Sequence, residues 1–414
     1  MLNKKITVLV INHALAIPAF RRRWEKLAEN ENFEVHIILP SYLEQFYFGE
    51  KVVYINKNMR KGSFHIHALK LSHPSNYGSS KFLNLKQELL KIDADFVYLI
   101  GNEGIDYLQQ AIKGVKKIIP KAKIAFFTMN AKPLNYKKAK NPFSYLRGWK
   151  KFQRIKNNCD IAIGHYPGCL ENLRREGFEK PIYLQTQVGV DEALFVPNEV
   201  YRTAIRKELD WESNFIIGFC GRLKSIKGVD TLVDSFLNIR KTNTQTRLLL
   251  VGNGELKEKI LEKFKKLDIL ESIHITDFID QEKVPQYMNA MDVLILGSKT
   301  TKNWIDTFPL VTVQAQASGV PVIASNSSSI PWQLGDSALL FSEGNDKDLS
   351  VKIQKIIDNS QLRNELIQKG RSRSLAFFCH EGMTNNFIEI VKQTLDNKPK
   401  FHEKGESYNQ HKAY

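Results

Sequence analysis

Short apolar runs alternate with amphipathic segments along the first half of the chain. The runs are rich in β-branched and aromatic residues and lie at 6–11, 34–39, 96–100, 123–128, 161–164 and 182–187. Between several of them, helical periodicity marks residues 19–31, 82–92 and 141–156. Apolar runs of this length without polar alternation are typical of strands buried on both faces. Their alternation with helices predicts a parallel sheet with right-handed crossovers.

The second half of the chain repeats this pattern. Its apolar runs lie at 215–220, 247–251, 273–276, 293–296, 320–324 and 338–341, and its helical segments at 229–240, 256–267, 282–291 and from about residue 308. The predicted class is α/β with two Rossmann-like, doubly wound domains, at 1–198 and 199–370. Proline and polar residues interrupt both patterns near 196–199, which places the boundary there. Residues 398–414 are polar and are expected to form a disordered tail.

Composition places the chain among ordinary globular proteins. It has 414 residues, of which 43% are hydrophobic and 25% are charged. The apolar run at 6–11 is too short for a signal peptide, and no run approaches the roughly 20 residues that span a bilayer. The cysteines at 159, 169, 220 and 379 lack metal-ligand spacing and are expected to be free thiols in a reducing compartment. We therefore expect a cytoplasmic protein.

The positive charge of the chain is concentrated in one segment. The net charge is +16, and fourteen Lys or Arg residues with no Asp or Glu lie between Tyr107 and Cys159. On a helical wheel, 141–156 has an apolar half (Tyr145, Leu146, Trp149, Phe152 and Ile155) and a basic half (Arg147, Lys150, Lys151 and Arg154). Two interpretations stay open: segment 132–156 contacts an anionic membrane, or the apolar half packs on the sheet and the basic half is solvated. An anionic acceptor would explain the same charge. The usual nucleic-acid recognition motifs are absent from the sequence, so no nucleic-acid partner is expected.

Two glycine-containing loops follow predicted strands of the second half. The first loop begins at Gly221 and carries Arg222 and Lys227. Two cations at the carboxyl end of a strand can bind a diphosphate, although cations on a loop can also be merely solvated. The second loop contains Gly252, where the missing side chain permits either close approach to a ligand or a tight turn.

The segment 304–325 combines a helix start with polar side chains. Thr307 is the predicted N-cap, and Pro309 is expected in the first turn, where its missing N–H costs least. The free amides and the dipole of a helix start favour a phosphate. Asp306 can accept hydrogen bonds from sugar hydroxyls, and Gln314 can bond a ribose.

Taken in order, these motifs resemble the retaining GT-B glycosyltransferases of family 4, the glycosyl transferases group 1. The motifs are Gly-Arg-Leu at 221–223, Lys-Gly at 227–228, Val-Gly-Asn-Gly at 251–254, Phe-Pro-Leu at 308–310 and Ala-Ser-Gly-Val-Pro-Val-Ile-Ala-Ser at 317–325. The resemblance is strong over 215–341, moderate over 160–197 and faint before that.

The resemblance implies two Rossmann-like domains that face each other across a cleft. The second would hold a nucleotide-diphosphate sugar and the first a glycan or lipid-linked acceptor. A final helix within 371–397 would cross back to the first domain. By position, Arg222 and Lys227 would bind the diphosphate. The resemblance assigns the rest of the donor to Asp306, Thr307, Phe308 and Leu310 (sugar side), Gln314 (ribose), Phe278 and Ile279 (base), with Gly221 and Gly252 on the loops. No metal or other cofactor is expected, because the cations and the helix start would stabilise the leaving diphosphate.

The sequence departs from the family pattern at several positions, including the loop at 12–18, where the family has a glycine-rich loop. The paired glutamates of the family are here Asp306 and Gln314, and the glycine after Phe308 is Pro309, which cannot donate a backbone hydrogen bond. On the acceptor side, the family's histidine corresponds to Asn130, which cannot take up a proton. His13, after the first strand, could compensate or be structural.

Three functions are compatible with these residues. The favoured one is a hexosyltransferase-like enzyme of polysaccharide or glycolipid biosynthesis, acting with retention in the cytoplasm or peripherally at the inner membrane face. The alternative is a catalytically impaired subunit of a glycan-assembly complex that binds sugar nucleotide or glycan. A nucleotide-sugar epimerase is a weaker third, because no His or Glu constellation supports it.

Overall fold

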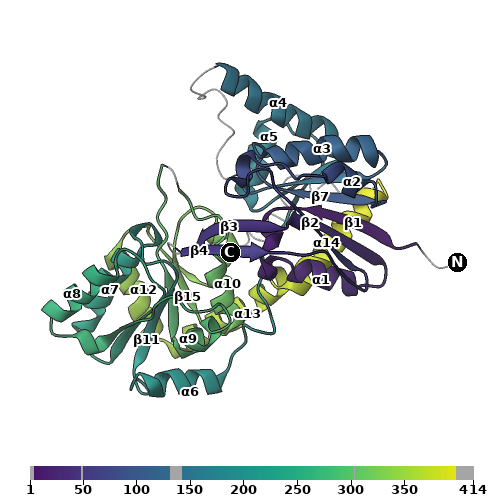
Figure 1. Ribbon diagram of the computed structural model, residues 1–414. Coiled ribbons are helices and arrows are strands. Elements are labelled where there is room, and N and C mark those ends of the chain that lie inside the picture. The colour runs from purple at the N-terminus through teal and green to yellow at the C-terminus, as the bar shows by residue number, and fades with distance from the viewer. Residues whose placement is uncertain (1–3, 48–49, 131–141, 303, 398–414) are drawn as a thin grey trace. The chain divides into compact units, whose positions relative to one another are not determined.

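The computed structural model describes residues 4–47, 50–130, 142–302 and 304–397 (Figure 1). These residues form two compact units, which we describe separately. Unit 1 comprises Met1–Val188 and the segment that begins at His380, and unit 2 comprises Gly189–Cys379. The predicted boundary at 198/199 therefore lies ten residues inside unit 2.

Unit 1 is built on a sheet whose strand order is β10-β9-β8-β7-β1-β2-β6-β5. Every neighbouring pair is parallel except β5 and β6, which are antiparallel. The long apolar strands at its centre were predicted from their lack of polar alternation. The strands are β1 (Ile6–Ile11), β2 (Phe33–Pro40), β5 (Met59–Lys61), β6 (Phe64–Leu69), β7 (Phe96–Ile100), β8 (Lys123–Thr128), β9 (Ile161–Gly164) and β10 (Ile182–Leu184).

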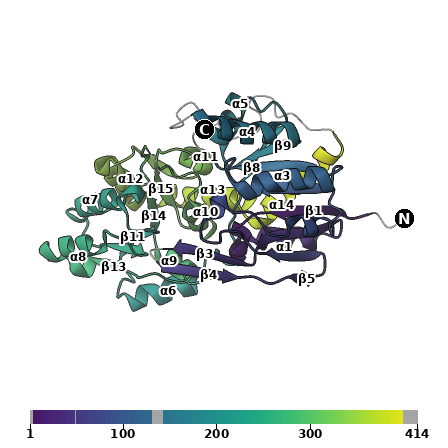
Figure 2. The same cartoon turned by 45° about the horizontal axis from the view of Figure 1, so that its top comes forward.

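Helices cover both faces of the unit 1 sheet (Figures 1 and 2). One face packs against α1 (Arg22–Glu29) and α14 (His380–Leu395), whose Trp24 and Phe387 rings meet with centroids 5.1 Å apart. The other face packs against α2 (Leu85–Leu89), α3 (Asp106–Ile118) and α4 (Pro142–Asn158). Helix α5 (Pro167–Arg175) follows β9, and a separate hairpin is formed by β3 (Tyr42–Tyr47) and β4 (Glu50–Ile55).

Unit 2 is built on a wholly parallel sheet with the order β13-β12-β11-β14-β15-β16. Its order reverses at β11, so the loops after β11 and β14 diverge to opposite sides and leave room for a ligand at the carboxyl edge. The strands are β11 (Phe215–Cys220), β12 (Thr246–Val251), β13 (Ile273–Ile275), β14 (Val293–Leu296), β15 (Val322–Ser325) and β16 (Leu339–Phe341).

Helices also cover both faces of the unit 2 sheet, as Figure 2 shows. The predicted class, α/β with doubly wound sheets, is therefore confirmed. No helix of the described residues is long and apolar enough to cross a membrane. The helices are α6 (Glu199–Glu208), α7 (Val229–Arg240), α8 (Lys257–Lys266), α9 (Val284–Ala290), α10 (Leu310–Ala317), α11 (Ile330–Leu334), α12 (Asp346–Asp358) and α13 (Ser360–Phe377).

Candidate functional site

Glycines allow the backbone of neighbouring loops to meet at the carboxyl edge of the unit 2 sheet. Gly228 has a φ of +72°, and a Cβ there would lie 2.0 Å from the Gly297 carbonyl oxygen. A Cβ on Gly252, whose φ is +131°, would lie 2.2 Å from the Gly221 carbonyl oxygen. Packing of backbone against backbone therefore requires glycine at 228 and 252, independently of any ligand.

Lys227 and Asp306 form the centre of this edge. The Lys227 ammonium donates to the Asp306 carboxylate at 2.6 Å, and the Ser298 hydroxyl donates to the same carboxylate oxygen at 2.8 Å. The Lys227 nitrogen also lies 4.8 Å from the centre of the Trp304 ring, a cation–π distance. Asp306 is buried, so the pair is fixed in one geometry. The structure thus joins two residues that are 79 positions apart in sequence.

Sequence reasoning missed Ser298 and Trp304. Ser298 is the second residue after β14, so its position near a strand end was the available signal, and Trp304 was marked only by its position two residues before Asp306. Neither residue type is by itself indicative of a phosphate or sugar site.

Arg222 lies on the same loop as Lys227 but is exposed. Within the described part of the chain, its guanidinium makes no hydrogen bond or ion pair. Its neighbour Lys224 lies 3.9 Å from Glu255, an ion pair at the surface. Arg222 therefore keeps its five donors available for an anionic group.

Helix α10 begins later than the sequence predicted. Its first residue is Leu310 and its N-cap is Pro309, so the prediction of Thr307 as N-cap is wrong. Pro309 has no N–H to donate and a fixed φ, so it occupies the position immediately before the helix. The Thr307 carbonyl is instead held by the Ser329 hydroxyl, which donates to it at 2.5 Å.

The start of α10 retains free donors. The Thr312 amide bonds back to the Pro309 carbonyl at 3.2 Å. The Leu310 and Val311 amides have no acceptor among the residues that the structure describes. A helix start with two free amides is a favourable position for an anion.

The remaining predicted donor residues lie around this edge. Gln314, on α10, is buried, and its side-chain amide has no hydrogen-bond partner in the described ranges. Phe308 packs on Phe378 with ring centroids 5.4 Å apart. On the loop after β13, Phe278 is half exposed and Ile279 is partly buried, an apolar surface against which a base could stack.

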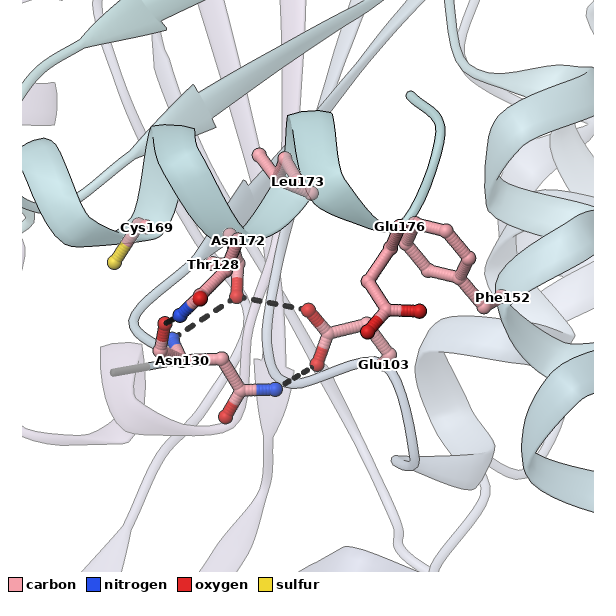
Figure 3. Close-up of a pocket in the computed structure, with 8 residues that line it drawn as sticks. All are labelled: Glu103, Thr128, Asn130, Phe152, Cys169, Asn172, Leu173 and Glu176. Carbon is pink, nitrogen blue, oxygen red and sulfur yellow. Dashed lines mark hydrogen bonds between the residues drawn. The ribbon is translucent and has the colours of Figure 1, made fainter. Parts of the chain in front are cut away.

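In unit 1, Asn130 belongs to a hydrogen-bonded group at the ends of β7 and β8. Figure 3 shows the Asn130 amide and the Thr128 hydroxyl directed at the two carboxylate oxygens of Glu103. The Thr128 hydroxyl donates at 3.0 Å, and the Asn130 side chain donates to the other oxygen. These residues line a cavity of about 10 Å³, roughly the space of one water molecule. Asn172 fixes the Asn130 backbone by donating to its carbonyl at 3.1 Å.

Glu103 is the acidic group that the sequence analysis missed. It is buried, and desolvation raises the pKa of its carboxyl to about 7, with a smaller contribution from the charge of Glu176. A carboxyl group with a pKa near 7 can exchange a proton at neutral pH. The available signal was an acidic residue three positions after the end of a buried strand, in Ile-Gly-Asn-Glu at 100–103.

His13 lies at the end of β1, the strand next to β7. Its Nδ1 is 2.9 Å from the Tyr107 hydroxyl, which donates to the Ile100 carbonyl at 2.9 Å. Because that hydroxyl hydrogen is used, Nδ1 of His13 is the donor, and Nε2 is unprotonated. Burial lowers the pKa of His13 to about 4, so the ring is neutral at physiological pH.

The two halves of α4 have different surroundings. Phe152 and Ile155 are buried in unit 1, whereas Phe143, Leu146 and Trp149 are 84%, 43% and 43% exposed. The apolar half therefore splits: packing on the sheet, one of the two interpretations left open, holds for Phe152 and Ile155 but not for Leu146 and Trp149. It splits because only the last turns of α4 reach the sheet.

The basic half of α4 splits in the same way. Lys151 bonds Asp106 at 2.6 Å and Arg154 bonds Gln109 at 2.6 Å, so neither forms part of a free basic surface. Lys150 and Arg147 are exposed, although Arg147 lies 3.7 Å from Asp106. Residues 132–141 of the predicted basic segment lie outside the described residues.

Comparison with known families identifies the C-terminal part of the chain. The sequence model of the family "Glycosyl transferases group 1" matches residues 201–373, which include every donor-side residue named above. Residues 201–373 are thus similar to the glycosyl transferases group 1 domain. Unit 2 therefore has the class of domain that its motifs predicted, while the retaining mechanism and family 4 stay predictions.

Curated relatives match over different shares of their length. Mannosylfructose-phosphate synthase of Agrobacterium fabrum is 23% identical over 250 residues, 58% of this chain and 54% of that protein. A 41.2 kDa protein in the cps region of Klebsiella pneumoniae is 25% identical over 88% of this chain and 94% of its own. The capsular polysaccharide biosynthesis glycosyltransferase CapM of Staphylococcus aureus is 28% identical over 42% of this chain and 47% of its own. The match thus spans about half of the first and third relatives.

Solved structures match nearly the whole chain. Sucrose-phosphate synthase of Thermosynechococcus elongatus has a TM-score of 0.68 at 17% identity, over 95% of this chain and 100% of that one. Anabaena HepE, solved in complex with UDP, has a TM-score of 0.66 at 15% identity, over 94% and 100%. The predicted GT-B fold class is confirmed.

Proposed function

We propose that this glycosyl transferases group 1 protein moves a sugar from a nucleotide-diphosphate sugar to a glycan or lipid-linked acceptor, with retention of configuration. The observation that carries the proposal is the combination in unit 2 of an unpaired Arg222, a fixed Lys227–Asp306 pair and two free amides at the start of α10. Three kinds of hydrogen-bond donor that can bind an anion, a guanidinium, an ammonium and backbone amides, thus lie at one sheet edge.

The donor would lie with its diphosphate at Arg222, Lys227 and the start of α10. Fixed positive groups favour the leaving diphosphate as its charge develops, so the proposal needs no metal ion there. Asp306, held by Lys227 and Ser298, would accept hydrogen bonds from the donor sugar. The buried, unpartnered amide of Gln314 would bond the ribose, and Phe278 and Ile279 would contact the base.

The transfer breaks the bond from the anomeric carbon to the diphosphate and forms one to an acceptor oxygen. Retention requires the acceptor hydroxyl to attack from the face that the diphosphate leaves. Its proton can then pass to the departing phosphate oxygen, so no histidine base is needed. Asn130 and Glu103 would orient the acceptor through hydrogen bonds.

Glycan or glycolipid biosynthesis is the proposed setting, supported by the capsular polysaccharide glycosyltransferase among the relatives. Nucleotide sugar as donor is supported by the UDP complex of the structurally similar HepE. The cysteines at 159, 169, 220 and 379 are free thiols, which fits the proposed cytoplasmic location.

Peripheral attachment to the inner membrane face is part of the proposal. Phe143, Leu146 and Trp149 on the first turns of α4 are exposed and stand next to Arg147 and Lys150. Exposed aromatic and aliphatic residues beside cations are typical of helices that bind anionic lipid surfaces. Such attachment would bring the enzyme to a lipid-linked acceptor.

The test is incubation of the full chain with a panel of nucleotide sugars, with release of free nucleoside diphosphate as the readout. We expect release with at least one donor, and its loss in Arg222→Ala and Lys227→Ala. Lys224→Ala, which removes a third cation of the same loop, is the matched control and should keep the activity. Absence of release and of binding for every donor would overturn the proposal.

The alternative function, a non-catalytic subunit, is favoured by Asn130 at the position of the family's histidine. It predicts donor binding that depends on Arg222 and Lys227, without release of diphosphate under any condition. The same panel therefore separates the two functions.

A further inference from the structure

A group of histidine and glutamate side chains lies on β2 and β6, outside the residues assigned to donor or acceptor. Glu34 and His36 come from β2 and His65 from the paired strand β6, where His36 and His65 are register partners. Their nearest side-chain atoms, one carboxylate oxygen and two ring nitrogens, all lie within 4.8 Å of one another. We propose that Glu34, His36 and His65 bind a divalent transition-metal ion, with zinc as the best fit.

The tautomers of the neighbouring rings support a cation at this position. His67 lies 2.7 Å from Glu88 through Nδ1, so Nδ1 of His67 carries the proton and its Nε2 accepts. That Nε2 is 2.9 Å from Nδ1 of His36, which must therefore be the donor. Because Nδ1 of His36 carries the proton, Nε2 of the neutral ring has an unprotonated lone pair. This lone pair and the Glu34 carboxylate, 3.6 Å apart, are two acceptors that face each other.

His65 provides a second, independent observation. Its Nε2 is buried and lies 2.9 Å from the Glu34 carboxylate oxygen, close enough for an ion pair but without the geometry of a regular hydrogen bond. A ring nitrogen and a carboxylate oxygen this close together can both bind one ion that lies between them and His36.

The distances suit a small tetrahedral ion. Zinc bonds of about 2.0–2.1 Å to nitrogen and oxygen place neighbouring ligand atoms about 3.3 Å apart. The observed separations of Glu34 from His65 and His36, 2.9 and 3.6 Å, lie on either side of that value. The His36 and His65 rings are stacked with centroids 4.4 Å apart, so both must turn about χ2 to point at one ion. This torsion is soft in histidine.

The surroundings fit a site with one open coordination position. Two imidazoles and a carboxylate are a usual zinc ligand set, with water as the fourth ligand. The Glu34 side chain is 34% exposed, so solvent and ion can reach it. His67 and Glu88 would orient His36 from behind, as hydrogen-bonded partners commonly do for metal-bound histidines. The ion would join β2 to β6 and stabilise unit 1.

The test uses the full chain, stripped with a chelator and titrated with Zn²⁺ by calorimetry and with Co²⁺ by visible absorption. We expect one Zn²⁺ per chain, a Co²⁺ spectrum of four-coordinate intensity, and a Tm that rises by about 5 °C at saturating zinc. Glu34→Gln, His36→Gln and His65→Gln should each weaken binding at least a hundredfold. Glu88→Gln should weaken it about tenfold to a hundredfold.

His73→Gln is the matched control, because His73 is an exposed histidine of the same unit outside the group. It should bind zinc as the wild type does. Circular dichroism of each stripped variant establishes that lost binding is not lost folding, and Glu34→Gln preserves side-chain shape. Failure of the wild type to bind zinc or cobalt, or equal binding by the three ligand variants, would overturn the proposal.

Discussion

The edge of unit 2 proposed to bind the donor and the edge of unit 1 proposed to bind the acceptor have the same architecture and opposite electrostatics. Both lie at the carboxyl ends of parallel strands. The unit 2 edge presents an exposed Arg222 and free amides, whereas in unit 1 the Glu103 carboxyl is already satisfied by Asn130 and Thr128. The unit 2 edge is therefore open to an anion. In the unit 1 edge the polar groups already bond one another, so a ligand could interact with them only through further hydrogen bonds. Under the proposed function, this difference would place binding energy in unit 2 and orientation of the acceptor in unit 1.

The largest expected effect comes from the cations of unit 2. Lys227→Ala removes a proposed diphosphate ligand and also deprives the buried Asp306 carboxylate of one of its two hydrogen-bond donors. We expect diphosphate release to fall about 10²–10³-fold, with a similar fall for Arg222→Ala. Lys224→Ala should stay within about threefold of wild type. Similar losses in all three variants, measured by initial rates, would show that only general charge matters.

Glu103 gives the next largest effect, on stability. Its folded pKa of about 7 exceeds its ordinary value of 4.5, so the folded chain binds more protons than the unfolded chain between these values. Stability should therefore be fully present below pH 4.5 and decline as pH rises towards 7, by about 3 kcal/mol at most. Glu103→Gln should remove this decline in urea unfolding followed across that range.

A matched comparison isolates that contribution. Glu176→Gln removes the neighbouring charge but keeps Glu103, so most of the decline should remain, since burial is the larger cause. An identical pH profile for wild type and Glu103→Gln would show that the carboxyl titrates normally.

Helix α4 permits a comparison within a single element. Lys150→Glu reverses an exposed charge and should weaken sedimentation with anionic liposomes about tenfold. Lys151→Ala breaks the bond to Asp106 and should lower stability by about 1 kcal/mol with little effect on sedimentation. Trp149→Ala should act like Lys150→Glu. Equal sedimentation of all variants would indicate that the positive charge of this segment binds an anionic acceptor and not a membrane.

The smallest expected effect tests a departure from the family pattern. Gln314→Glu restores the carboxylate that the family uses at this position, which makes stronger hydrogen bonds to ribose hydroxyls. We expect nucleotide binding about three- to tenfold tighter, measured by calorimetry. Gln316→Glu, two positions on and bonded to Ser337, is the control and should not tighten binding. Weaker binding by Gln314→Glu would place its side chain away from the ribose.

Much of this fold could be predicted because buried parallel strands carry a strong signal. β1, β7, β8, β9, β11 and β14 have the predicted bounds. The hairpin of β3 and β4, the exposed edge strand β5 and its inner neighbour β6 were missed. Polar residues interrupt the apolar pattern of these strands, and in β6 these are the histidines at 65 and 67. Likewise, Thr307 was a reasonable N-cap by residue type, and only the bond from Ser329 shows why the helix begins later.

The site divides along a similar line. Arg222, Lys227 and Asp306 could be located because they belong to motifs of fixed order. Glu103 could not, because its pKa depends on burial by residues from β8, α4 and α5 that are distant in sequence. The histidine group on β2 and β6 could not be predicted for the same reason, because its members come together only when the two strands pair.

The central claim, that unit 2 binds a nucleoside diphosphate through Arg222 and Lys227, is tested most directly by calorimetry. UDP, GDP and ADP would be titrated into the full chain, the Arg222→Ala/Lys227→Ala double variant and Lys224→Ala. We predict micromolar binding of at least one nucleotide to wild type and to Lys224→Ala, and a loss of at least a hundredfold in the double variant. Binding of equal strength in all three proteins, or in none, would contradict the account.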